Sequence, residues 1–286
     1  MVLESLIKTE KLEEQPYFIL IGTVLYVIVG SIVTLLLSPF FGPEAISVLF
    51  VVLVAFPALP QILSLFVLAE IEKEKDAILG STTLGRNYTM ISILMLFFVG
   101  LIFSFTFAFL VIPQTQATKM FTLEIKEAQA VSTTFTGQFT YQTPNSFQFV
   151  FEEIFFHNLW VLLAMFALSA VYGAGAVLTL TWNASVIGLF LANAGLSLVT
   201  KNAGNTALIT GIASSFLGLL PHGVFEIAGY CCGVLAGGLI SVTIVRKAYN
   251  KPVFFNLTSD IAKITALSIV FIAVGAIIES YAIVGG

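Results

Sequence analysis

Residues Leu219 to Val245 read "LLPHGVFEIAGYCCGVLAGGLISVTIV", a long and almost uncharged segment. Its one charged residue is Glu226, and the larger segment that begins at Asn202 contains no other Asp, Glu, Lys or Arg. A transmembrane helix needs about 20 consecutive, mostly apolar residues. This segment is longer than that, so it indicates a chain that crosses a lipid bilayer.

The composition of the whole chain supports a membrane protein. Of its 286 residues, 58% are hydrophobic and only 10% are charged, whereas a soluble domain carries about 25% charged residues. The lipid bilayer is therefore the expected surrounding. The net charge of −4 gives no reason to expect a nucleic-acid partner. The sequence predicts no signal peptide, because the N-terminus mixes charges where a signal peptide has a basic and then an apolar region.

The apolar segments predict an all-α, polytopic transmembrane bundle of about seven spans with broken or re-entrant helices. The expected spans lie near residues 17–38, 45–69, 88–112, 157–174, 177–195, 223–245 and 263–283. These spans divide the chain into four units. The units are a cytoplasmic N-terminal segment 1–16, a three-span unit 17–112, an external Thr/Gln-rich loop 113–146 and a membrane domain 147–286.

A helix break is expected at Pro221 and Gly223. Proline has no backbone N–H and disfavours helix at the residue before it, and glycine allows close backbone approach. The sequence therefore predicts a re-entrant half-helix near 206–219, a bend, and then a full span. Glu226 would lie in the first turn of that span, near the positive end of the helix dipole.

The positions of Lys and Arg predict an orientation, since cytoplasmic loops carry the excess of these residues. With a cytoplasmic N-terminus and seven crossings, nine of the 12 basic residues face the cytoplasm. The three on the outside would be Lys119, Lys126 and Lys201. This arrangement places the 113–146 loop and the C-terminus outside, in a multi-pass protein of the cell membrane.

Six polar residues near the apolar spans form a candidate junction for an ion, a solute or a partner. Each of the two histidines of the chain lies four residues from a glutamate, so each pair shares one face of a helix. The six residues are His222, Glu226, Glu153, His157, Asn158 and Asn183. His157 is expected at the outer end of its span, whereas Asn183 is expected nearer the inner side.

Four interpretations of the junction stay open: interhelical hydrogen bonds, a path for an ion or solute, a metal site, and catalysis. Two His and two Glu would suit Zn²⁺, but whether metal binds is not decided, and no cofactor is expected. A closed and fully paired cluster would favour a scaffold. A cavity open to one side would favour transport, and a three-ligand site with an open position would favour metal chemistry.

Two stretches, 151–191 ("FEEIFFHNLWVLLAMFALSAVYGAGAVLTLTWNASVIGLFL") and 218–240 ("GLLPHGVFEIAGYCCGVLAGGLI"), resemble the stage II sporulation protein M family of integral membrane proteins. The resemblance covers roughly residue 147 to the C-terminus, and His157 stands where asparagine is common in the family. The positions that carry the resemblance are Phe151, Ile154, Phe155, Asn158, Gly173, Asn183, Gly188, Pro221, His222, Gly223 and Glu226.

The resemblance implies a non-enzymatic scaffold or anchor in envelope remodelling. The family's best-known members resemble a membrane anchor for peptidoglycan-remodelling enzymes in spore formers, so membrane or envelope proteins, or a second copy of the chain, are the expected partners. A transporter or channel with a polar site at broken helices is the alternative. An intramembrane metal-dependent hydrolase is a third, because "FEEIFFHN" is similar to a Glu-Glu-x-x-x-Arg protease motif, with His157 in place of the arginine. The chain lacks the Gly-x-Ser-x-Gly and His-Glu-x-x-His motifs of hydrolases, so an enzyme is not expected.

Overall fold

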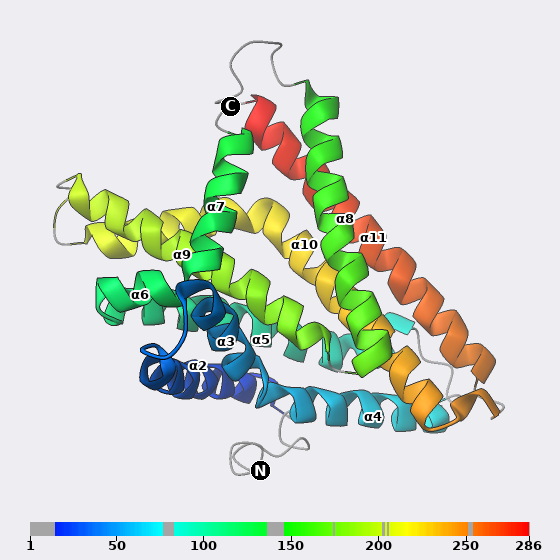
Figure 1. Cartoon of the computed structure of the whole chain (residues 1–286). Helices are drawn as coiled ribbons and strands as arrows, with labels where there is room; N and C mark the ends of the chain where they lie inside the picture. The colour runs from blue at the N-terminus through cyan, green and yellow to red at the C-terminus, as the bar shows by residue number, and fades with distance from the viewer. Residues whose placement is uncertain are drawn as a thin grey trace.

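The computed structural model describes residues 15–76, 83–135, 146–173, 175–201, 204, 206–250 and 254–285, and every element in these ranges is a helix (Figure 1). Most of the expected cytoplasmic segment 1–16 lies outside the described residues. The elements are α2 (Phe18–Leu37), α3 (Pro43–Ala55), α4 (Ala58–Asp76), α5 (Thr83–Val111), α6 (Gln114–Met120), α7 (Thr122–Phe135), α8 (Phe147–Tyr172), α9 (Ala176–Thr200), α10 (Ala207–Val245), η1 (Ala248–Asn250) and α11 (Phe254–Gly285).

The structure confirms a multi-pass helical membrane protein. Among the described residues, six helices are long and apolar enough to cross a bilayer: α2, α5, α8, α9, α10 and α11. A seventh crossing is available if α3 and the first part of α4 form one span, with a bend of 44° between them. One continuous core joins these helices from Ile19 in α2 to Ile272 in α11.

The predicted break at Pro221 and Gly223 is wrong. Residues Ala207–Val245 form one α-helix of 39 residues that runs through Pro221. At about 1.5 Å per residue this helix is about 58 Å long, roughly twice the thickness of the bilayer core. Figure 1 shows that α10 bends instead of breaking, because its two halves run in different directions. Neither a re-entrant half-helix nor a helix start beside Glu226 is present.

The surroundings of Pro221 explain why the helix bends without breaking. Its ring removes one backbone hydrogen bond and crowds the preceding turn, which kinks a helix. A Cβ atom added at Gly218 would meet nothing within 4 Å, and one at Gly223 would meet only Leu219 Cβ at 4.0 Å. The face of the bend that carries Gly218 is therefore open, whereas Phe216 and Leu219 on the same helix pack against the core.

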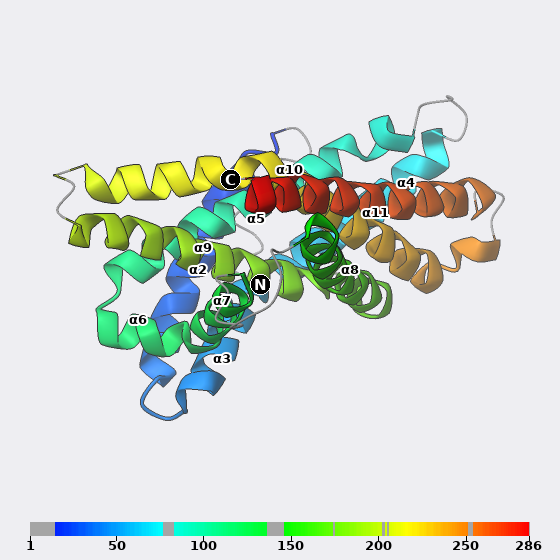
Figure 2. The ribbon, with the colours of Figure 1, turned by 90° about the horizontal axis from the view of Figure 1, so that it is seen from above.

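The N-terminal half of α10 is held against α9, and the two helices run side by side (Figure 2). A Cβ atom added at Gly211 would lie 2.7 Å from the carbonyl oxygen of Ala194 and 2.8 Å from Cα of Gly195. Small residues of this kind let helix backbones approach closely. This packing keeps the first half of α10 helical up to the bend.

The C-terminal half of α10 packs closely against α8. A Cβ atom at Gly237 would lie 2.5 Å from the carbonyl oxygen of Phe166. In the same contact, Ser169 Oγ donates a hydrogen bond of 2.9 Å to the carbonyl oxygen of Val234. This contact fixes the register of α8 against α10 and so decides which polar side chains of the two helices meet.

The region expected as the loop 113–146 contains two helices, α6 and α7; its residues 136–145 lie outside the described part. Glu124, in α7, is fully buried. Its carboxylate accepts hydrogen bonds from Ser47 of α3 and from Ser185 of α9. These contacts pack α7 against the membrane helices and stabilise its backbone, so the described part of this region is helical where an open loop was expected.

Candidate functional site

The site begins with the length of α8. Ser146 caps this helix by accepting a hydrogen bond from the backbone N–H of Phe149 at 3.3 Å. Because α8 begins at Phe147 and not near residue 157, His157 and Asn158 lie well inside the helix. The helix thus begins about ten residues before the expected start of this span, and the placement of His157 at the outer end of the span stays a prediction.

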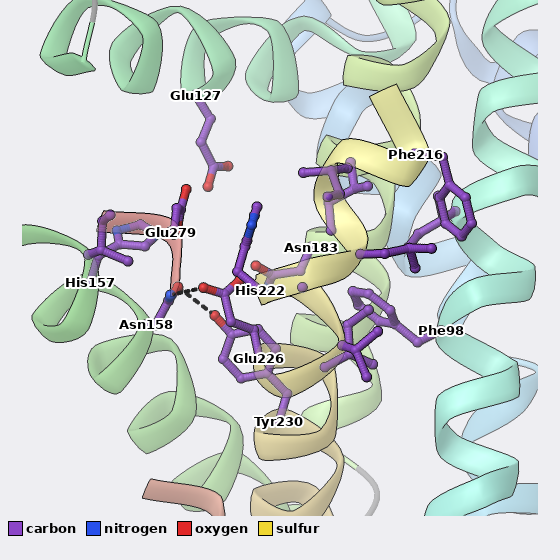
Figure 3. A pocket seen from close by; sticks show the side chains of 18 of the residues that line it. Phe98, Glu127, His157, Asn158, Asn183, Phe216, His222, Glu226, Tyr230 and Glu279 are labelled. Carbon is purple, nitrogen blue, oxygen red and sulfur yellow. Dashed lines mark hydrogen bonds between the residues drawn. The ribbon is translucent and has the colours of Figure 1, made fainter. Parts of the chain in front are cut away.

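Asn158 joins α8 to α10 through two hydrogen bonds. Its Nδ2 donates to Oε1 of Glu226 at 2.8 Å, and its Oδ1 accepts from the hydroxyl of Tyr230 at 2.7 Å (Figure 3). Glu226 and Tyr230 are four residues apart on α10, so they share one face of that helix. Asn158 and Tyr230 are only 7% and 6% exposed, so this triad is a buried polar contact.

Helix α11 makes room for Glu226 at Gly275. A Cβ atom added at Gly275 would lie 2.7 Å from Cγ of Glu226 and 3.3 Å from the carbonyl oxygen of His222. Any larger residue at this position would displace the glutamate. Gly275 therefore lets the Glu226 side chain pass between α10 and α11.

A further carboxylate comes from α7. Oε2 of Glu127 accepts a hydrogen bond of 2.7 Å from the indole Nε1 of Trp182 on α9. Figure 3 shows Glu127 pointing from α7 toward the space that His157 and His222 also face.

These groups surround one cavity of about 520 Å³, a volume within the usual range of small-molecule pockets. Its wall is built from α5, α7, α8, α9, α10 and α11. Glu153, His157 and Val224 line it and are also exposed, so the cavity reaches the surface of the chain. The lining residues are Phe98, Ile102, Glu127, Glu153, Ile154, His157, Asn158, Asn183, Ile187, Phe216, Leu219, Leu220, His222, Gly223, Val224, Glu226, Ile227, Tyr230 and Glu279.

The cavity brings together all six polar residues predicted from the sequence, and Gly223 lines it as well. Asn183 was expected nearer the inner side than the other five residues, and it lines the same cavity as they do. Pro221 is exposed and does not line the cavity.

Three polar residues of the cavity were missed: Glu127, Tyr230 and Glu279. Glu279 is the one charged residue between Ile264 and the C-terminus, a signal that ionisable residues in membrane helices usually give. Tyr230 follows Glu226 by four residues and could have been found by helical spacing. Glu127 was assigned to an external loop, and no local pattern corrects that assignment.

The described residues do not form a metal site, because no three of their His, Cys, Asp or Glu side chains lie close enough together to hold an ion. Of the described residues, no Ser, Thr or Cys lines the cavity, and Tyr230 supplies the one hydroxyl group. Carboxylates, imidazoles and amides can bind a polar ligand by hydrogen bonds and by charge. The arrangement is thus suited to binding.

Comparison with known proteins identifies the family. The family model described as Stage II sporulation protein M matches residues 92–282, about two thirds of the chain. The chain belongs to the stage II sporulation protein M family. The match begins inside α5, well before the start near residue 147 that the resemblance suggested, and it includes α6 and α7.

An uncharacterized protein of Methanocaldococcus jannaschii is similar to this member of the stage II sporulation protein M family. The two are 29% identical over 137 residues, which are 47% of this chain and 71% of the archaeal protein. No solved structure matches the chain. The residues that line the cavity lie between Phe98 and Glu279, so the family's own region forms its whole described wall.

Proposed function

We propose that this stage II sporulation protein M family member binds a small polar solute inside its helical bundle and lets it pass into or across the membrane. The observation that carries the proposal is the convergence of carboxylates, imidazoles and amides from α7, α8, α9, α10 and α11 on one cavity of about 520 Å³. Helix junctions in membrane proteins are common places for such sites.

The unpaired groups in the cavity support solute binding over a purely structural role. An ionisable side chain inside a membrane is costly and usually has a partner. Glu226 has one in Asn158. By contrast, four other ionisable side chains of the wall make no hydrogen bond or ion pair with the described residues. They are Glu153, His157, His222 and Glu279.

The scaffold role expected from the sequence accounts for part of the site only. The Tyr230–Asn158–Glu226 contact holds α8 to α10, as a scaffold requires. It does not account for a cavity that reaches the surface beside that contact. We propose a function in binding and passage, without a chemical step on the solute.

Two glycines on α10 allow a matched test. Gly223 lines the cavity, whereas Gly218 does not, and both have open space where a side chain would begin. Gly223→Leu should fill part of the cavity without a backbone clash, and Gly218→Leu adds the same side chain on the same helix outside the cavity. The full chain is reconstituted in lipid vesicles, and the flux of radiolabelled choline, alanine, glutamate and mannitol is measured.

The expected result is flux of at least one solute above that of protein-free vesicles, reduced by Gly223→Leu and kept by Gly218→Leu. Flux at the protein-free level for all four solutes would overturn the proposal. Equal loss in both variants would also overturn it, because the cavity would then not be the route.

A further inference from the structure

We propose that the cavity selects a small organic cation; this inference rests on the proposed function and names its ligand class. Among the residues that the structure describes, four carboxylates line the cavity, and no Lys or Arg does. The two histidines are the remaining ionisable groups of the lining apart from Tyr230. A low-dielectric cavity lined by groups that ionise to one sign of charge favours ions of the opposite sign. The four carboxylates are Glu127, Glu153, Glu226 and Glu279.

The carboxylates keep acceptor capacity toward the cavity. Each ionised carboxylate can accept about four hydrogen bonds. Glu226 accepts one from Asn158 on Oε1, and Glu127 accepts one from Trp182 on Oε2. Within the described ranges, none of the four forms an ion pair. A cationic ligand would therefore supply the positive charge with which these carboxylates can pair.

The rest of the wall fits the organic part of such a ligand. Phe98, Phe216 and Tyr230 contribute aromatic rings, and aliphatic side chains of Ile and Leu fill the space between them. In Figure 3, Phe98 and Phe216 lie across the cavity from His157 and Glu279. Aromatic faces attract ammonium groups within about 6 Å of the ring centre. One side of the cavity is thus suited to charge and the other to methyl and methylene groups.

The size of the cavity favours an organic cation over a bare metal ion. A volume of about 520 Å³ is in the range of pockets for small organic ligands. The carboxylates come from four helices, α7, α8, α10 and α11. No three ligating side chains of the described residues converge on one point. A spread of acidic groups around apolar walls matches an extended ligand.

Three isosteric probes test the charge preference: choline, its neutral isostere 3,3-dimethylbutan-1-ol and the anion 3,3-dimethylbutanoate. Binding of each to the full chain in detergent is measured by isothermal titration calorimetry. Glu226→Gln keeps an oxygen that can accept the Asn158 hydrogen bond and removes the charge. Glu153→Gln removes a charge from an exposed position with little risk to folding. Glu44→Gln is the control, because Glu44 is exposed, pairs with Lys126 and lies outside the cavity.

The expected result is that choline binds at least about tenfold more tightly than either isostere. Glu226→Gln and Glu153→Gln should each weaken choline binding about tenfold, with Glu44→Gln unchanged, since a hydrogen-bonded charge contributes about that factor. Binding of the neutral or anionic probe at least as tight as choline overturns the cation inference and leaves the solute cavity standing. Absence of choline binding overturns the inference even where the flux of another solute upholds the proposed function.

Discussion

Asn158 uses both ends of its amide at the contact between α8 and α10. The NH₂ group donates to Glu226 and the carbonyl oxygen accepts from Tyr230. No smaller or purely accepting side chain could serve both partners. A buried polar group that loses its hydrogen-bond partner costs free energy.

Asn158→Leu is therefore expected to lower the free energy of unfolding by about 1–3 kcal/mol, since it leaves Glu226 and Tyr230 without their shared partner. The midpoint of thermal unfolding in detergent measures the loss. Asn183→Leu is the matched control, because the one hydrogen bond of Asn183 goes to the carbonyl oxygen of Thr179 in its own helix. Equal shifts for both variants would show that the Asn158 bridge contributes nothing special.

Helix α7 is anchored through a buried carboxylate. Burial raises the pKa of Glu124, and the hydrogen bonds from Ser47 and Ser185 oppose this effect without cancelling it. A carboxyl group with a raised pKa in the folded state contributes most to stability at low pH. As the pH rises above its ordinary value of 4.5, the unfolded state ionises more readily, so stability falls until the pH passes the raised pKa.

Replacing Glu124 with glutamine removes this titration. As the pH rises from about 4.5, we expect the midpoint temperature of thermal unfolding to fall more in the wild type than in Glu124→Gln. Thermal unfolding of both proteins across a pH series measures the difference. A difference that stays constant with pH would mean that Glu124 is not buried in the folded protein. Glu44→Gln, at an exposed ion pair, gives the background.

The bend of α10 decides where His222 and Glu226 lie, because both follow Pro221 within five residues of the same helix. A straight helix would put the ends of α10 far apart, at about 52 Å between positions 209 and 244. Ile209 and Ile244 are 71% and 58% exposed, so both can carry spin labels after replacement by cysteine.

Pro221→Ala restores a backbone N–H and should straighten the helix. The expected result is a shorter distance between labels at positions 209 and 244 in the parent protein and a longer one in Pro221→Ala, measured by pulsed electron paramagnetic resonance. The buried Cys231 and Cys232 should take little label. An unchanged distance distribution would assign the bend to packing against α9 and not to the proline.

At the scale of the whole molecule, the number of crossings depends on α3 and α4. Six helices qualify as spans without them, and seven qualify if the bent pair crosses as one span. The excess of Lys and Arg predicts seven, with a cytoplasmic N-terminus. Protease protection of terminal tags in oriented vesicles should then find the two termini on opposite sides. Termini on the same side would mean that the bent pair turns back within the membrane.

Much of this architecture follows from local sequence, and the exceptions have physical causes. The spans, the helical class and the six polar residues of the cavity could be predicted, since hydropathy and four-residue spacing are local signals. The continuity of α10 depends on its packing against α9 through Gly195 and Gly211, which spacing alone does not show. Likewise, α7 is helical and packed because distant Ser47 and Ser185 bind Glu124.

If the cavity between the helices binds solutes, water and small solutes must reach it. The labelling rate of a cysteine in its wall by a water-soluble maleimide, with the full chain in lipid nanodiscs, measures this access. Asn183→Cys lies in the wall, and Leu235→Cys, at a position with 0% exposure in the core of α10, is the control. We expect Asn183→Cys to be labelled much faster than both Leu235→Cys and the wild type. Labelling of Asn183→Cys as slow as that of the core control would show that the cavity is closed to water.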